Sequence, residues 1–438
     1  MILRGFVTYA LVGALLFSNL TVAQGAASKR PKPPDQVCIG TQCVTTPSQN
    51  VNVGTLKFHP GFYPYFNYAG GVTQNRLANG DLKLISSLKP NDNVAGIAIA
   101  IMWRSIDKGS SAPSYDWSLI DAYLAAVKSV NKRLWVRVQD AAYGNGNTVE
   151  AGTKIVPDWL INKYGIANVE LNYNPMPHGV IAKRYVPAVT QAYLAMYQAM
   201  AARYDSDPSF EGVTINEETA YAVETSGSAV SLATPGADYN VNAMFDQLYV
   251  LMAGMRDPDK GFKTSNVQLS GNYLFQTSDS AAGWLAVIQR VEQYKMMLGS
   301  ADSWIPSWTY RNLPYSPNQL SGPGAPKPTN PDYTRGSASD ENYRGWWKGS
   351  VDWRGKILFG PDAEATDFGG YITKNMKPIP TLAQIWETRS TLDHAHYFFF
   401  DINYQPTGNY GGPPQQWSTG QYPWVQTAGA TNTTNPYQ

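Results

Sequence analysis

The sequence predicts an α/β fold in which eight parallel strands close into a (β/α)8 barrel, the TIM-barrel architecture, with long loops on its C-terminal face. Two observations support this prediction. Apolar, β-branched runs of strand length alternate with segments of helical spacing through most of the 438 residues. No Gly-rich phosphate loop follows the first strand, although such a loop is typical of the rival architecture, a doubly wound open sheet.

Residues 1–27 have the pattern of a secretory signal peptide. Arg4 precedes an apolar run from Phe6 to Phe17, and small residues follow, with cleavage expected after Ala23 or Ala27. The run is too short for a convincing membrane span, so no membrane association is expected beyond this signal. The sequence therefore predicts a secreted or periplasmic protein.

Residues 28–54 form a Pro/Lys-rich linker that contains Cys38 and Cys43, the only two cysteines of the chain. In an oxidising compartment they are expected to close a small disulfide loop, and a metal site is a poor rival because no His or third Cys lies nearby. The barrel is expected over residues 55–404. The Gly/Pro/Asn-rich tail, 405–438, is expected to wrap the barrel or to be partly disordered.

Composition narrows the class of ligand. Lys and Arg number 34 and Asp and Glu 33, so the net charge of +1 provides no field to attract nucleic acid, which is not expected as a partner. The 13 Trp and 28 Tyr suit a surface that grips neutral, hydroxyl-rich ligands such as carbohydrates. Four histidines, none at ligand spacing with carboxylates, predict no metal and no cofactor. Composition does not indicate an oligomeric state.

Eight apolar runs are candidates for the barrel strands. They cover residues 55–65, 94–103, 133–139, 213–215, 266–272, 356–362, 379–387 and 396–402. Helical spacing recurs between most of them, over residues 77–88, 119–130, 187–203, 243–255 and 280–298. The connection from 387 to 396 is too short for a full helix, whereas residues 300–354 are long enough to form a folded loop over a site.

Chemistry in a (β/α)8 barrel takes place at the carboxyl ends of the strands, and each predicted strand delivers a polar or aromatic group there. The candidate site residues are His59, Trp103, Arg104, Asn216, Glu217, Glu218, Asn272, Tyr273, Asp362, Trp386 and Glu387. A single polar residue at a strand end is more often solvated or capping. A whole set of carboxylates and amides without a lysine indicates a functional rim instead.

The stretch with the strongest signal follows Val213–Ile215. This β-branched run ends directly in Asn216, Glu217 and Glu218, which are costly at a buried strand end unless they are solvated, paired or used. Cleavage of a glycosidic bond needs two such acids, one to protonate the leaving oxygen and another to attack the anomeric carbon or activate water.

Asn216-Glu217 at the fourth strand end and Glu387 at the predicted seventh resemble the motifs of clan-A glycoside hydrolases, which are retaining (β/α)8 enzymes. The resemblance implies that Glu217 is the acid/base, that Asn216 binds the sugar 2-hydroxyl and that Glu387 is the nucleophile. Trp103 with the downstream segments 115–117 and 120–121 is also similar to the second strand and helix of that clan.

Two departures leave alternatives open. The clan usually places a Trp at the end of the eighth strand, where this sequence has Phe398–Asp401. The connection from the predicted seventh strand to the eighth is also abbreviated. If residues 360–364 instead formed the seventh strand end, Glu364 or Asp362 would take the nucleophile role, and a shift of register would make Glu218 the acid/base.

The expected function is thus an exported glycoside hydrolase, retaining, that acts on a poly- or oligosaccharide. The alternative is a non-catalytic glycan-binding barrel in polysaccharide export or surface adhesion. Release of reducing sugar would separate the two. The sugar, the linkage and endo or exo action depend on loop geometry and do not follow from the sequence.

Overall fold

A computed structural model of the chain describes residues 36–39, 42–45, 55–66, 71–88, 94–142, 154–173, 179–215, 241–271, 280–300, 353, 355–363, 394–402 and 433–437. The chain divides into two units, residues 1–32 and 33–438. All described residues belong to the second unit.

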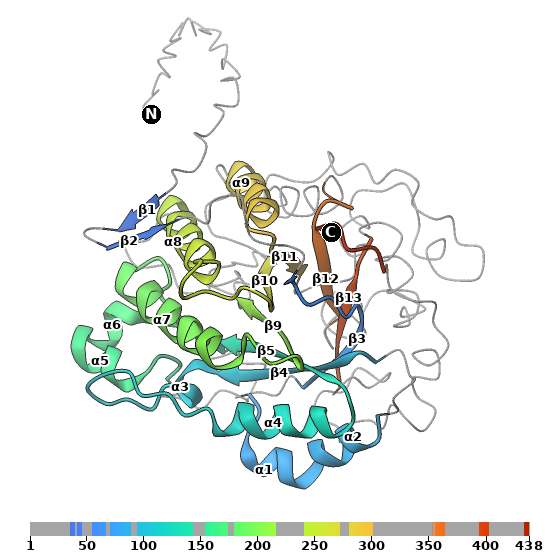
Figure 1. Cartoon of the computed structure of the whole chain (residues 1–438). Helices are drawn as coiled ribbons and strands as arrows, with labels where there is room; N and C mark the ends of the chain where they lie inside the picture. Colours follow the sequence, from blue (N-terminus) through green and yellow to red (C-terminus); the bar gives the residue numbers. More distant parts are fainter. Residues whose placement is uncertain are drawn as a thin grey trace, which may run out of the picture. The chain divides into compact units, whose positions relative to one another are not determined.

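The second unit contains a closed barrel of eight parallel strands (Figure 1). In order around the barrel they are β3 (Gly61–Phe66), β4 (Gly96–Met102), β5 (Arg133–Gln139), β9 (Phe210–Ile215), β10 (Asn266–Gly271), β11 (Met297–Ser300), β12 (Leu358–Ala363) and β13 (Tyr397–Asp401). Pairing of β13 with β3 closes the ring. The predicted (β/α)8 fold is confirmed.

The seventh strand was assigned wrongly from the sequence. The sixth strand is β11, which the prediction had placed at the end of the helix over 280–298, and the run 356–362 therefore supplies the seventh strand, β12. Because β12 pairs with β11 on one side and with β13 on the other, no place remains for 379–387 in the barrel. The helix stops early because Lys295 has a positive φ of 51°, which an α-helix does not allow.

Helices surround the barrel, and the four long ones among the described residues match the predicted ranges within a few residues except at the end of α9. They are α4 (Ser118–Ser129), α7 (Pro187–Tyr204), α8 (Val241–Met255) and α9 (Ser280–Gln293). The predicted helix over 77–88 is built from α1 (Gln74–Arg76), the π-helical turn η2 (Leu77–Asp81) and α2 (Leu82–Ser86). A short helix, α3 (Trp103–Ile106), follows β4 directly.

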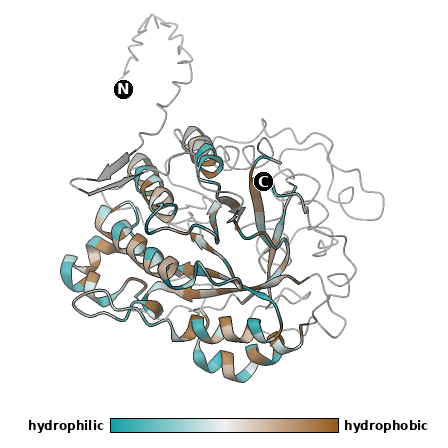
Figure 2. Cartoon of the chain, in the orientation of Figure 1, coloured by the Kyte–Doolittle hydropathy of each residue, from teal (hydrophilic) through white to brown (hydrophobic). Residues whose placement is uncertain are grey.

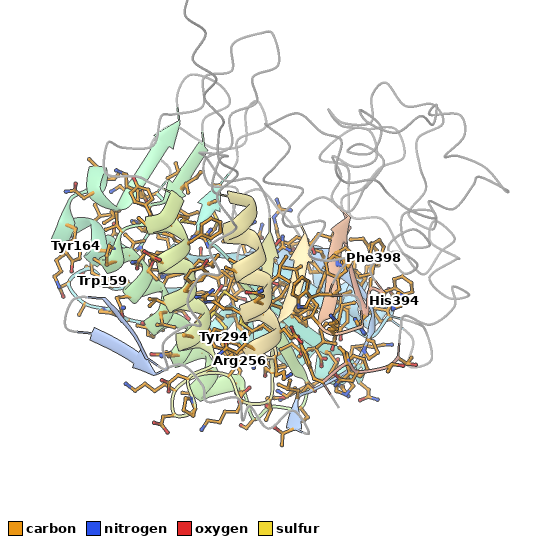
Figure 3. All side chains as sticks on the ribbon, turned by 90° about the horizontal axis from the view of Figure 1, so that it is seen from above. Trp159, Tyr164, Arg256, Tyr294, His394 and Phe398 are labelled. Atoms are coloured by element: carbon orange, nitrogen blue, oxygen red, sulfur yellow. The ribbon has the colours of Figure 1, made fainter. Side chains whose placement is uncertain are left out.

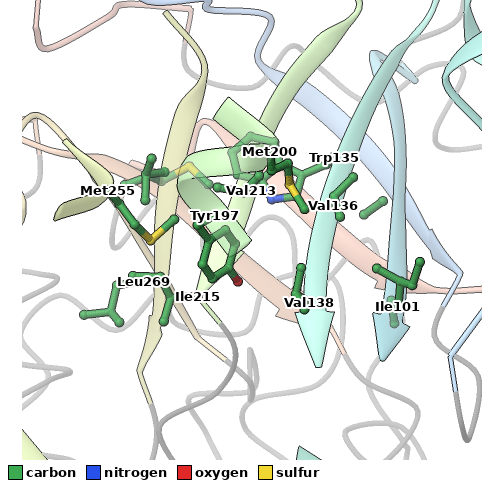
Figure 4. Close-up of a cluster of buried hydrophobic side chains, with 14 of the residues drawn as sticks. Ile101, Trp135, Val136, Val138, Tyr197, Met200, Val213, Ile215, Met255 and Leu269 are labelled. Atoms are coloured by element: carbon green, nitrogen blue, oxygen red, sulfur yellow. The ribbon is translucent and has the colours of Figure 1, made fainter. Parts of the chain in front are cut away.

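Helix α7 is fixed to the outside of the barrel by tyrosine hydroxyls. Tyr193 donates to the carbonyl of Val138 at 2.6 Å, and Tyr197 donates to the carbonyl of Thr214 at 2.8 Å. Figure 4 shows the apolar layer between strands and helices, where Tyr197 lies close to Ile215. In Figure 2 the barrel strands are mostly hydrophobic, whereas the helices carry both hydrophobic and hydrophilic residues. This pattern is expected of a strand layer buried on both faces.

A buried arginine connects the amino ends of β10 and β11 with the end of α8. Arg256 donates from Nη1 to the carbonyls of Phe262 and Ser265, both at 2.9 Å, and from Nη2 to the carbonyl of Lys295 at 3.0 Å. It lies beside Tyr294 in Figure 3. Burial lowers the pKa of Arg256 to about 10. These three carbonyls replace the water that the guanidinium loses.

The connection between β5 and α7 forms an excursion of its own, residues 140–186. It contains α5 (Asp158–Tyr164), α6 (Ile166–Val169) and an antiparallel sheet in the order β6-β8-β7, made of β6 (Ala141–Ala142), β8 (Gly179–Ala182) and β7 (Glu170–Tyr173). Asp140 and Arg184, both buried, form an ion pair at 2.6 Å across its base. Glu170 accepts hydrogen bonds from the backbone of Ile155 and Val156 at 2.6 and 2.8 Å.

The hairpin of β1 (Gln36–Ile39) and β2 (Gln42–Thr45) sets Cys38 directly opposite Cys43. Directly opposed residues in an antiparallel ladder have Cα atoms about 4.5–5.5 Å apart, which lies within the range that a disulfide spans. The backbone is thus compatible with the predicted disulfide, which stays a prediction. Among the helices that the structure describes, none combines the length and apolarity of a membrane span.

His396, at the start of β13, accounts for one expected pH effect. Its Nδ1 accepts from the backbone N–H of Phe359 and its Nε2 donates to the carbonyl of Thr434, both at 3.2 Å. Only the neutral ring can make both bonds, and burial lowers the pKa of His396 to about 4.

We predict that this histidine reduces stability in acid. Between pH 6.5 and about 4 this histidine is protonated in the unfolded state and neutral in the folded state. The free energy of unfolding therefore falls as the pH falls, by up to about 3 kcal/mol. His396→Gln should remove this component in urea unfolding measured from pH 7 to 4.5. His394→Gln, at an exposed position two residues away, is the matched control and should keep it. Equal pH slopes for wild type and His396→Gln would contradict the prediction.

Candidate active site

The interior of the barrel is polar toward the carboxyl ends of its strands. Alternation along each strand turns Arg137 of β5, Thr214 of β9, Gln268 of β10 and Asp362 of β12 inward, and all four side chains are buried. Closer to the amino ends the interior is filled by aromatic rings, for example Trp135 against Phe399 at 5.1 Å between ring centroids. The polar layer therefore lies on the side where barrel enzymes carry out chemistry.

Arg137 and Asp362 form an ion pair across the barrel. Their strands, β5 and β12, are four positions apart on the ring of eight and so face each other. Nη2 of Arg137 contacts Oδ2 of Asp362, and the side chains are only 6% and 1% exposed. The guanidinium also lies over the ring of Tyr65, 4.7 Å from its centroid. Oδ1 of Asp362 has no hydrogen-bond partner among the described residues.

A chain of hydrogen bonds crosses the barrel below the Arg137–Asp362 pair. It runs from Trp135 to Gly360, each of which lies one inward position before a member of the pair, toward the amino ends of the strands. Trp135 Nε1 donates to Thr214 Oγ1 at 2.7 Å, and this hydroxyl donates to Gln268 Oε1 at 2.6 Å. Gln268 Nε2 then donates to the carbonyl of Gly360 at 2.6 Å. A Cβ on Gly299 would lie 2.4 Å from Gln268 Nε2, so glycine is needed there for the glutamine to cross. The chain fixes β12 two residues before Asp362.

Most of the predicted rim lies outside the described residues. This applies to Asn216, Glu217, Glu218, Asn272, Tyr273, Trp386 and Glu387. The structure does describe the strands that lead to several of them. β9 ends at Ile215, one residue before Asn216, and β10 ends at Gly271, one residue before Asn272.

The corrected strand order changes the reasoning about the second acid. Glu387 was selected as the nucleophile because it closed the predicted seventh strand, and that reason no longer holds. The seventh strand is β12, which contains Asp362 and is followed by Glu364 after Ala363. This is the alternative that the sequence had left open. Glu364 itself lies outside the described residues.

His59 was expected at the carboxyl end of the first strand, and this placement is wrong. The strand begins only at Gly61 and runs through Pro64 to Phe66, so it starts and ends later than the expected run 55–65. His59 therefore lies at the amino end of the barrel. Its Nδ1 is 2.7 Å from Oε2 of the buried Glu211, and its backbone N–H donates to Oε1 at 3.0 Å.

Trp103 and Arg104 lie at the carboxyl end of β4, as predicted, but their contacts are with protein. Trp103 is fully buried, with its ring 4.9 Å from that of Tyr193. Arg104 donates to the carbonyl of Val156 at 3.0 Å and pairs with Asp158 at 2.5 Å. Both side chains thereby hold other elements against the barrel, and a role of either in substrate binding stays a prediction.

Arg137 and Gln268 were not among the candidates from the sequence. Each lies inside a strand rather than at its end, so a search of strand ends misses it. The available signal was parity: Arg137 interrupts the run 133–139 at an inward position, as a residue serving the barrel interior would. Within the described ranges, no three His, Cys, Asp or Glu residues gather closely enough to hold a metal ion.

No protein-family model and no curated protein sequence matches the chain. Its structure is similar to the catalytic domain of β-amylase from Paenibacillus polymyxa, at 14% identity and a TM-score of 0.47, over 85% of this chain and 100% of that one. It is also similar to β-galactosidase from the psychrophilic Marinomonas ef1 (11%, 0.47, 82% of this chain and 58% of that one) and to endo-glycoceramidase II from Rhodococcus sp. (10%, 0.44, 82% and 78%). Similarity at this level carries no argument about activity.

The ion pair leads to a stability prediction. Arg137→Met leaves the buried carboxylate of Asp362 without its counter-charge and should lower the free energy of unfolding by about 3–5 kcal/mol. Adding Asp362→Leu removes the second charge and should recover most of that loss, because apolar side chains of similar volume often replace a buried pair at no net cost.

Urea unfolding of the wild type, both single variants and the double variant forms a double-mutant cycle that measures the coupling. A double variant less stable than both singles would show that the pair does not form.

Proposed function

We propose that this protein is a glycoside hydrolase that cleaves O-glycosidic bonds of a poly- or oligosaccharide, using one acid from the fourth strand end and one from the seventh. The observation that carries the proposal is the buried carboxylate of Asp362, held inside the carboxyl half of the barrel by Arg137. The fourth strand, β9, leads directly into Asn216 and Glu217. Carboxylates from these two strands are what the clan-A resemblance of the sequence implies.

Barrel geometry favours cooperation between these acids. β9 and β12 are three positions apart on the ring of eight, so groups at their carboxyl ends face the same central space from different sides. Two carboxyl groups that flank a sugar from opposite sides can act on one glycosidic bond, whereas acids from neighbouring strands would approach it from the same side.

In the proposed reaction Glu217 gives its proton to the leaving oxygen as the bond to the anomeric carbon breaks. In a retaining course the seventh-strand acid attacks that carbon and forms a glycosyl ester. Glu217 then takes a proton from a water molecule, which hydrolyses the ester. Asn216 holds the sugar 2-hydroxyl in both steps. In an inverting course the second acid removes the proton of an attacking water instead. Asp362 and Glu364 are the candidates for this second acid, and Glu218 is the alternative to Glu217.

The proposal includes export. Residues 1–27 have the composition of a signal peptide, and a disulfide between Cys38 and Cys43 fits an oxidising compartment. A polysaccharide outside the cell is the corresponding substrate.

We predict that Glu217→Gln abolishes hydrolysis and leaves folding intact, since an amide keeps the shape but cannot deliver the proton. The measurement is release of reducing ends from a panel of neutral polysaccharides, with circular dichroism as the folding control. Full activity of Glu217→Gln, with Glu218→Gln inactive, would move the acid/base role to Glu218.

The stereochemical course has its own readout. Proton NMR of the first product detects its anomer, and we expect the configuration of the substrate to be kept. Inversion would indicate carboxyl groups about 6.5–9.5 Å apart instead of about 5–5.5 Å. A wild-type protein that is held on a glycan column and releases no reducing ends would support the glycan-binding alternative.

A further inference from the structure

We propose that Asp362 and Ser270 form a subsite for a hydroxyl group of a neutral sugar, with Arg137 as the positioning residue that holds Asp362 in place. The inference rests on the proposed function and deepens it, because it names the class of substrate. Of the two candidates for the second acid, it assigns substrate binding to Asp362 and leaves Glu364 as the second acid.

The side chains of Asp362 and Ser270 have hydrogen-bonding capacity that the described residues do not use. Oδ1 of Asp362 and Oγ of Ser270 are buried, and neither has a hydrogen-bond partner in the described part of the chain. Buried polar atoms of native proteins are nearly always paired, and an unpaired acceptor of a charged group is costlier than a neutral one. Such atoms indicate a place that a ligand or a water completes.

The two side chains also occupy the same layer of inward-facing residues in the barrel. Gln268 and Gly360 are in contact across the barrel, since Gln268 Nε2 donates to the carbonyl of Gly360. Ser270 and Asp362 each come two residues later on the same strands, which is one inward position closer to the carboxyl ends. They therefore belong to the layer directly above the hydrogen-bond chain, on the substrate side of the barrel.

The charge of the Arg137–Asp362 pair and the burial of the position determine which ligand group fits. Arg137 neutralises one oxygen of Asp362, so the pair carries no net charge and offers a single acceptor. A sugar hydroxyl can donate to Oδ1 and accept from Ser270 Oγ–H, and it is small enough for a buried position. The carboxylate of a uronic acid has no proton to donate and would meet the negative oxygen. At this position the subsite thus selects a hydroxyl over a carboxylate, which favours neutral over anionic glycans.

The same contacts argue against Asp362 as nucleophile. Its Oδ2 is bound by Arg137, and the residue lies within β12 rather than beyond its end. Catalytic side chains of barrels come from the strand ends. In this assignment Asp362 binds substrate, and Arg137 acts only through Asp362.

The experiment measures binding of defined polysaccharides by the full chain. Glu217→Gln is the parent, so that turnover does not consume the probe. Affinity electrophoresis and titration calorimetry are run with a β-glucan, a galactomannan and, as the anionic probe, polygalacturonate. The test variants are Ser270→Ala and the double variant Arg137→Met/Asp362→Leu.

Each test variant has a matched control. Ser265→Ala removes another buried serine hydroxyl, just before the amino end of the same strand, where it contacts Lys57. Asp140→Leu/Arg184→Met removes another buried ion pair, which belongs to the excursion. Unfolding curves of all variants show whether each is folded, and Ser270→Ala keeps the test decisive if the double variant does not fold.

We expect preference for a neutral polysaccharide, with Kd raised about ten- to a hundred-fold in Arg137→Met/Asp362→Leu and about three- to ten-fold in Ser270→Ala. Both controls should stay within two-fold of the parent. An unchanged Kd in the test variants, which would mean that only a buried water completes these atoms, overturns the inference, as does preference for polygalacturonate. A wild type that neither binds nor cleaves any glycan overturns the proposed function as well, so the two failures are distinguishable.

Discussion

Charge balance across the interior of the barrel is the constraint on which the candidate site depends. A carboxylate as buried as that of Asp362 is tolerated only if a cation compensates it, and Arg137 reaches it from the opposite strand. The guanidinium is in turn supported by the face of Tyr65. Because the pair joins β5 to β12, it also fixes the distance between these two facing strands near their carboxyl ends.

The buried carboxylates at the two ends of the barrel, Glu211 and Asp362, differ in how many protein groups contact them. Near the amino ends, Glu211 receives hydrogen bonds from the backbone of His59 at 3.0 Å, from Tyr397 Oη at 2.8 Å and from Asn266 Nδ2 at 3.3 Å, and His59 Nδ1 lies 2.7 Å away. Such contacts are typical of a structural carboxylate, because protein groups engage both of its oxygens. Near the carboxyl ends, Arg137 is the one partner of the Asp362 carboxylate among the described residues, so one carboxylate oxygen is left to accept a hydrogen bond from a ligand.

The sequence was sufficient for the fold class and for most elements, and it failed where elements were short or carried a misleading residue. Long apolar runs such as 96–102 identify buried strands by themselves. β11 has four residues, too few to show a period, and it begins shortly after the end of α9 at Gln293. β3 contains Pro64, a residue that is unusual inside a strand, so the bounds of this strand do not follow from its residues. The interior residues Arg137 and Gln268 escaped because their partners, Asp362 and Gly360, are about 225 and 92 positions away in the chain.

The observed strand order removes an inconsistency of the predicted order, which concerns the connection between the seventh and eighth strands. With 379–387 as a strand, the seventh-to-eighth connection was too short for a helix, which breaks the β/α alternation. With β12 as the seventh strand, the segment before β13 grows to the residues between Ala363 and Tyr397, ample for a helix and a loop. In the corrected order Glu364 follows the seventh strand directly in the sequence, where the proposed acid Glu217 at the fourth strand end requires its partner. Connectivity and chemistry therefore favour the same assignment for independent reasons.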